Sequence, residues 1–196
     1  IERDALDGTR WQLRSEAGRG VMDGNAVNFP KAVLFDLDGT LLDSAPDMVA
    51  AIDAMRAERG QPPMPLEALR PHVSKGARAM VAAAFPEVAE DERERWIPEF
   101  LACYQRALGK YGTLFDGVDA MLSALEKAGC VWGIVTNKPE YLARQLMPVL
   151  GWEQRCAVLI GGDTLSARKP DPMPLIVAAE RIGIAPEDCV YVGDDE

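Results

Sequence analysis

The sequence predicts an α/β fold in which a parallel sheet is covered by helices on both faces and interrupted by one long helical insertion. Short apolar runs alternate with segments of helical periodicity in the second half of the chain. A further apolar run lies far upstream, and the segment between it and the next run is helical throughout. Such alternation implies right-handed crossovers between parallel strands, whose carboxyl ends hold the ligand site.

Four apolar runs are too short for helices and have the length of buried strands. They are residues 32–37, 131–136, 157–160 and 189–192. Three helical segments lie between or before the later runs, and a glycine follows each of them, which is typical of a helix C-terminus. These segments are residues 118–128, 140–150 and 172–182. We therefore assign residues 30–43 and 113–196 to a sheet domain.

The insertion between the first two strands, residues 44–112, has helical periodicity and no strand pattern. Its predicted helices are residues 46–59, 74–85 and 91–108, with a proline-rich stretch at 61–65. Because an ordinary connection between strands is much shorter, we expect this insertion to form a separate helical cap.

Both ends of the chain are unusual. Residues 1–29 are polar and glycine-rich without sustained periodicity, which predicts a leader or a disordered segment. At the other end the chain stops directly after an apolar run, where a loop should begin. We therefore expect the C-terminal part of the core to be missing from this sequence.

The composition disfavours several classes of function. A formal net charge of -10 would repel nucleic acid and anionic membrane surfaces. No apolar run approaches the ~20 residues of a membrane span, and the N-terminus lacks the apolar core of a signal peptide. The sole histidine, His72, disfavours a histidine metal cluster or a serine-histidine-aspartate triad. Four widely spaced cysteines suggest reduced thiols, and together these features predict a cytoplasmic protein. We expect it to be a monomer or a homodimer.

Asp36 and Asp38 end the first predicted strand. Residues two apart on a strand face the same way, so both carboxylates can point into one site. Carboxylates so close repel each other unless a cation or a shared proton intervenes. Mg²⁺ suits such a site, because it accepts one or two carboxylates together with waters and phosphate oxygens. Gly39 permits a sharp turn, and the Thr40 hydroxyl can hold that turn or a carboxylate oxygen.

The other predicted strands end in complementary groups. Thr136 and Asn137 offer a hydroxyl and an amide suited to phosphate oxygens. Lys169 offers a cation that can neutralise a phosphoryl group. Asp194 adds a carboxylate placed to complete a magnesium site. Each group alone is a weak signal, but their order on successive strand ends predicts one site for a small phosphorylated metabolite.

These residues lie in motifs that resemble those of haloacid dehalogenase-type phosphatases. The run FDLDGTLLDS at residues 35–44 resembles the first motif, and Thr-Asn-Lys at 136–138 the second. Lys-Pro at 169–170 and Gly-Asp-Asp at 193–195 resemble the third motif and the start of the fourth. The resemblance implies a Rossmann-like core with a type-one cap. Family members usually carry a further aspartate, a helix and another strand beyond the point where this sequence stops.

The resemblance also implies a role for each residue. Asp36 would attack phosphorus to form an aspartyl-phosphate, and Asp38 would protonate the leaving alkoxide and then activate water. Mg²⁺ would be held by the Asp36 carboxylate, the Asp38 main-chain carbonyl and the Asp194 carboxylate. Thr136 and Lys169 would hold the phosphoryl oxygens. The dehalogenases of the superfamily lack the second aspartate, so Asp38 favours phosphate chemistry.

Within the family, the cap and the second motif resemble bacterial phosphoglycolate phosphatases. Residues 73–78, 116–118 and 132–139 also resemble N-acetylmuramic acid 6-phosphate phosphatases. Both substrates carry a carboxylate, which Lys75 or Arg78 at the start of a cap helix could bind, although such residues are more often a solvated helix face. We expect hydrolysis of 2-phosphoglycolate to glycolate and phosphate. The alternatives are the N-acetylmuramic acid 6-phosphate reaction, a sugar phosphomutase and a non-enzymatic binding role.

Overall fold

The computed structural model describes residues 2–3, 11–12 and 30–194, and it confirms the predicted α/β fold. Its main sheet has four parallel strands in the order β7-β6-β3-β8. These strands are β3 (Ala32–Phe35), β6 (Val131–Val135), β7 (Leu159–Ile160) and β8 (Cys189–Val192). The chain builds outward from β3 to β7 and then crosses to the other side of β3. This reversal of strand order places a ligand crevice at the carboxyl end of β3.

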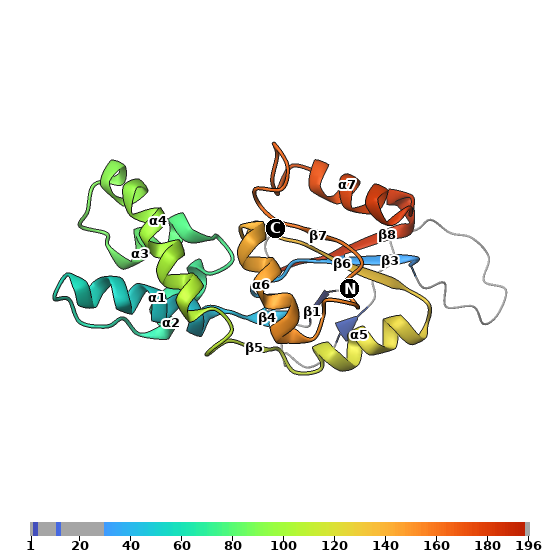
Figure 1. Cartoon of the computed structure of the whole chain (residues 1–196), viewed down its shortest axis with the longest axis horizontal. Helices are drawn as coiled ribbons and strands as arrows, with labels where there is room; N and C mark the ends of the chain where they lie inside the picture. The colour runs from blue at the N-terminus through green and yellow to red at the C-terminus, as the bar shows by residue number, and fades with distance from the viewer. Residues whose placement is uncertain (1, 4–10, 13–29, 195–196) are drawn as a thin grey trace.

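Helices cover both faces of the sheet (Figure 1). The helices of this part of the chain are α5 (Val118–Lys127), α6 (Glu140–Leu150), α7 (Met173–Ile182) and a 3-10 turn at Pro186–Asp188. Alternate side chains of β3 point to opposite faces. Val33 and Phe35 pack with residues of α5 and α6, whereas Leu34 shares a second core with Ala178 of α7. The sheet is therefore the middle layer of three.

The insertion forms a group of helices at one end of the molecule (Figure 1), and we call residues 44–112 the cap. Its helices are α1 (Ala45–Glu58), α2 (Leu66–Leu69), a 3-10 turn (Arg70–His72), α3 (Ala77–Ala84) and α4 (Glu90–Ala107). A hydrophobic cluster around Ile52, Met55, Phe85 and Phe100 fills the space between them. The hydrophobic core of the cap thus consists mainly of its own residues, together with Leu142 of α6, and no strand lies within the cap. No helix in the described part of the chain could cross a membrane.

Several details differ from the sequence-based expectations. β4 (Leu42–Asp43) and β5 (Thr113–Leu114) pair antiparallel where the chain leaves and re-enters the sheet domain. Strands of this length are too short to show a periodicity. The helix expected from residue 74 begins at Ala77, because Gly76 has a φ of 81°.

The N-terminal segment contains two further strands. β1 (Glu2–Arg3) and β2 (Trp11–Gln12) pair antiparallel, which the prediction of a leader without structure did not include. The rest of residues 1–29 lies outside the described residues, so the leader remains a prediction.

Asp47, in the first turn of α1, is a fully buried carboxylate that fixes the returning connection. Its Oδ2 accepts a hydrogen bond from the Gly109 N–H at 2.7 Å. Its Oδ1 accepts from the N–H groups of Tyr111 and Gly112 at 2.7 and 3.0 Å. Hydrogen bonds from main-chain donors compensate a buried carboxylate for the loss of hydration. Asp47 therefore ties the first cap helix to the segment that leads back to the sheet.

Replacing Asp47 by asparagine should lower the free energy of unfolding by about 2 kcal/mol, because the amide cannot satisfy the same donors. Chemical denaturation followed by circular dichroism measures the change. Asp91→Asn is a matched control, since Asp91 forms only an exposed pair with Arg95 on α4, and it should have little effect. Similar small losses in both variants would contradict the anchoring role of Asp47.

Candidate active site

A cleft of about 340 Å³ lies between the carboxyl edge of the sheet and the cap. Most of the side chains predicted for the site line it, and they come from both parts of the chain: Asp36, Asp38, Thr136, Asn137 and Lys169 from the sheet domain, and Lys75 and Arg78 from the cap. Asp194 contacts Ser74, another residue of the lining. The fold therefore brings all the predicted site residues to one region.

Asp36 directly follows β3, and its nearly buried carboxylate has two partners. Lys169 Nζ lies 2.6 Å from Oδ2, and the Leu37 N–H donates to Oδ1 at 2.7 Å. Burial raises the pKa of Asp36 more than Lys169 and the Leu37 N–H lower it, so the net direction is upward. Lys169 Nζ also donates to the Tyr191 hydroxyl at 2.7 Å. The lysine thus offsets part of the cost of a buried charge at Asp36.

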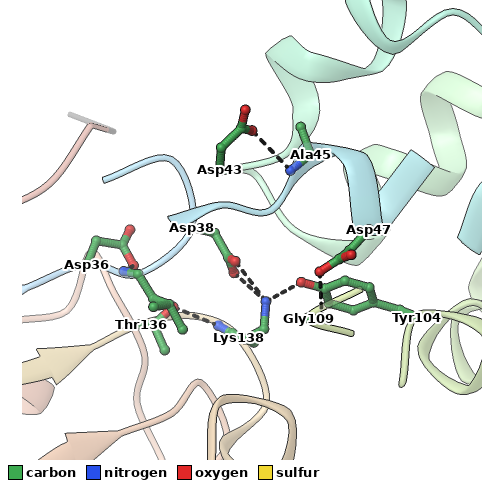
Figure 2. A network of polar contacts seen from close by, with 10 residues as sticks. Asp36, Asp38, Asp43, Ala45, Asp47, Tyr104, Gly109, Thr136 and Lys138 are labelled. Carbon is green, nitrogen blue, oxygen red and sulfur yellow. Dashed lines mark hydrogen bonds and ion pairs between the residues drawn. The ribbon is translucent and has the colours of Figure 1, made fainter. Parts of the chain in front are cut away.

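Asp38 is paired with a different lysine. Lys138 Nζ lies 2.7 and 2.9 Å from the two carboxylate oxygens of Asp38, and it also donates to the hydroxyl of Tyr104 on α4 (Figure 2). The Lys138 side chain is only 1% exposed. Sequence reasoning quoted Lys138 within the second motif but did not place it in the site. Its position in the loop that follows β6, next to Thr136 and Asn137, was the available signal.

The polar residues after β6 organise the loop. Thr136 lines the cleft, and its Oγ1 accepts a hydrogen bond from the Lys138 N–H at 3.2 Å. Asn137 Nδ2 donates to the Lys169 main-chain oxygen at 3.1 Å. The Asn137 amide nitrogen therefore joins the loops after β6 and β7, and the predicted contact of Asn137 with phosphate oxygens stays a prediction.

Asp194, in the loop after β8, is held from two sides. Its Oδ1 accepts a hydrogen bond from Thr40 at 2.9 Å, and its Oδ2 accepts one from Ser74 of the cap at 2.5 Å. Of the two roles expected for the Thr40 hydroxyl, holding the turn or a carboxylate oxygen, the structure shows the second. A Cβ atom on Gly39 would lie 2.3 Å from Asp194 Oδ2, so only glycine allows this approach. The turn after β3 and the loop after β8 thus meet at Asp194.

Basic side chains from both parts of the chain line the cleft. Lys75 precedes α3 instead of starting it, because the helix begins after Gly76. The Arg78 side chain is 63% exposed and forms an ion pair with Glu94, with Nε 2.7 Å from a carboxylate oxygen. Arg168, which sequence reasoning did not select, lies in the lining beside Lys169. These cations make the cleft suitable for a substrate with more than one negative group.

The donor set fits Mg²⁺ better than a transition metal. Within residues 30–194, no group of three or more histidine, cysteine, aspartate or glutamate side chains could hold a metal. The predicted magnesium site uses only two of these side chains, the carboxylates of Asp36 and Asp194, together with the main-chain carbonyl of Asp38. Oxygen donors completed by waters and phosphate are the set that Mg²⁺ prefers. Asp195 lies outside the described residues.

The fold and the site define a class of hydrolase. A family model described as haloacid dehalogenase-like hydrolase matches residues 30–196, and the chain belongs to this family. A phosphoglycolate phosphatase of Xanthomonas campestris pv. campestris (strain 8004) is 65% identical over 170 residues, which cover 87% of this chain and 77% of the relative. The predicted resemblance to phosphatases of this family, and the prediction that the chain is a phosphatase, are confirmed.

Two further comparisons point the same way. An N-acetylmuramic acid 6-phosphate phosphatase of Pseudomonas aeruginosa is 48% identical over 166 residues, covering 84% of this chain and 74% of the relative. The crystal structure of a protein from Haemophilus somnus 129PT, described as a predicted phosphoglycolate phosphatase, has a TM-score of 0.75 at 26% identity. That match covers 87% of this chain and 79% of the crystallised chain.

The Asp36–Lys169 pair leads to a prediction about pH. Lys169→Met should lower kcat/KM about 10²-fold or more, since a cation beside the reacting group is lost. It should also move the acidic limb of the pH profile to higher pH, because the attack predicted for Asp36 needs an ionised carboxylate and Lys169 lowers the pKa of Asp36. Phosphate release measured across pH tests both effects.

The control for this prediction is Lys127→Met, on an exposed position of α5, which should leave the profile unchanged. An acidic limb at the same pH in the Lys169 variant would contradict the role of the ion pair.

Proposed function

We propose that this chain hydrolyses 2-phosphoglycolate to glycolate and phosphate, and that Asp36 carries the phosphoryl group between the two steps. The observation that carries this proposal is the Asp36 carboxylate in a cleft, with the Lys169 ammonium 2.6 Å away and Thr136 in the same lining. A carboxylate beside a cation and a hydroxyl can attack phosphorus while those neighbours hold the phosphoryl oxygens.

In the proposed reaction Lys169 keeps its contacts with Asp36 and Tyr191 and directs a further N–H toward a phosphoryl oxygen, since an ammonium has three donors. The Thr136 hydroxyl would bind a second phosphoryl oxygen. Asp38 would protonate the leaving alkoxide and then take a proton from the attacking water. Asp36 and Asp194, with the Asp38 carbonyl, would hold Mg²⁺, which when bound neutralises charge on the phosphoryl group.

The choice of substrate rests on charge and on similarity. Lys75, Arg78 and Arg168 line the cleft in addition to Lys169, so a substrate with a carboxylate besides its phosphate would find a cationic partner for each group. The phosphoglycolate phosphatase named above is 65% identical to this chain. N-acetylmuramic acid 6-phosphate is the second candidate, because its phosphatase is 48% identical. A sugar phosphomutase is less favoured, since both of these relatives are named as phosphatases.

We extend the proposal to the domain organisation of the protein and to its location in the cell. Separate hydrophobic clusters support a core of residues 30–43 and 113–196 with a cap of 44–112. The cysteines of the described chain are unpaired, and burial raises the pKa of Cys156 to about 11. Unreactive thiols of this kind fit a reducing compartment, so we propose a cytoplasmic protein that acts on a small phosphorylated metabolite as a monomer or homodimer.

A substrate comparison tests the proposal. The kcat/KM for 2-phosphoglycolate should exceed those for N-acetylmuramic acid 6-phosphate and hexose 6-phosphates by about tenfold or more, because differential transition-state binding sets specificity. Asp36→Asn, assayed in parallel, should release no phosphate from any of these substrates. Phosphate release in this variant sample would therefore measure contaminating phosphatases. A preference for the amino-sugar phosphate would favour the second candidate, and activity retained in the variant would refute Asp36 as nucleophile.

Metal dependence gives an independent test. Chelation should abolish phosphate release, and added Mg²⁺ should restore it. Asp194→Asn should raise the Mg²⁺ concentration for half-activation by at least about tenfold, since a ligand charge is removed. Asp119→Asn on α5 is the matched control, because its carboxylate contacts only Arg155 at the surface. Equal activation curves for the wild type and Asp194→Asn would contradict the proposed ligand.

A further inference from the structure

The proposed function uses Asp38 as an acid and then as a base, and its contacts show what holds it in place. Both carboxylate oxygens of Asp38 are bound by Lys138 Nζ, at 2.7 and 2.9 Å. No other described side chain donates to Asp38 in the structure, and the partner ammonium is almost completely buried. A buried cation bonded to both oxygens of one carboxylate restricts the position of that carboxylate.

The electrostatic environment explains why Asp38 needs such a partner. Asp36 lies two residues away, and the negative charge of Asp38 acts to raise the pKa of Asp36. Lys169 pairs with Asp36, so its cation is committed to the other carboxylate. Without Lys138, Asp38 would be a buried carboxylate with a like charge nearby and no cation, and it would lose the contact that orients it.

Tyr104 of α4 fixes the lysine from the cap side. Its hydroxyl accepts a hydrogen bond from Lys138 Nζ, and its ring centroid lies 4.5 Å from the same atom. Burial, with the charges of Asp38 and Asp47, raises the pKa of Tyr104 well above its usual value. Tyr104 therefore stays a neutral phenol that accepts from the ammonium. The contact joins a cap helix to the acid–base residue of the core through one side chain (Figure 2).

We propose that Lys138 is a positioning residue for Asp38, that Tyr104 holds it there, and that the two together keep the Asp38 carboxylate oriented to activate water. In the affected step, a water oxygen bonds to phosphorus while a water proton passes to the Asp38 carboxylate. The bond between phosphorus and the Asp36 oxygen breaks, which returns the Asp36 carboxylate and releases phosphate. The inference rests on the proposed function and adds a cap residue to its second step.

Rapid-mixing kinetics with p-nitrophenyl phosphate test this proposal, because its leaving group departs without an acid and isolates the water step. Lys138→Met should show a burst of p-nitrophenol equal to the active-site concentration, followed by turnover about 10²-fold slower than wild type. Lys138→Arg should restore turnover to within about tenfold of wild type, since it keeps the cation. Slow turnover without a burst in Lys138→Met would mean that both steps were damaged, and would overturn the proposal.

Tyr104→Phe keeps the ring and removes only the hydroxyl, so it tests the cap contact in a variant that should fold. It should show a partial burst and turnover about tenfold slower, because Lys138 loses a partner. Tyr111→Phe, at an exposed tyrosine in the returning connection, should behave as wild type. Wild-type kinetics in Tyr104→Phe would overturn the link to the cap.

The two proposals fail in different ways. If the aspartyl-phosphate step of the proposed function is wrong, the wild-type protein itself forms no phosphoenzyme and Asp36→Asn keeps its activity. If only the role of Lys138 is wrong, the wild type turns over through Asp36 while Lys138→Met shows no burst.

Discussion

The site depends on holding two buried carboxylates within two residues of each other at the end of a buried strand. Water cannot solvate both Asp36 and Asp38 there, so each requires a cation. The structure supplies two lysines from different loops, Lys169 to Asp36 and Lys138 to Asp38. Separate partners give the two carboxylates different surroundings, which is the condition for one to act as nucleophile and the other as acid and base.

The strand order makes this division possible. β3 lies between β6 and β8, so the loops after its neighbours flank its carboxyl end. The β6 loop brings Lys138, and the loop after β8 brings Asp194. The cap then meets both sides of the site, through Tyr104 at Lys138 and Ser74 at Asp194. A change in the position of the cap would therefore act on the catalytic groups directly.

Local sequence signals predicted most of the fold. β8 and α6 have the predicted bounds, because an apolar run and a following glycine define them without reference to the rest of the chain. The pair β4 and β5 was not predicted, since its pairing is a contact between distant segments. The role of Lys138 was missed for a similar reason. A lysine in a loop normally lies at the surface, whereas this one is buried in contact with Asp38 and with Tyr104 of α4.

The contact of Asn137 could not be predicted for the same reason, because its amide bonds to the main chain of a distant loop. Lys75 precedes its helix because of the backbone conformation at Gly76. Motifs identify which residues gather at strand ends, whereas the pairing among them depends on tertiary contacts. The central claim is that Asp36, and not Asp38, takes the phosphoryl group. Rapid quenching during turnover, borohydride reduction and peptide mass spectrometry test it directly. We predict that reduction converts residue 36 alone to homoserine; conversion at residue 38, or at neither residue, would contradict the account.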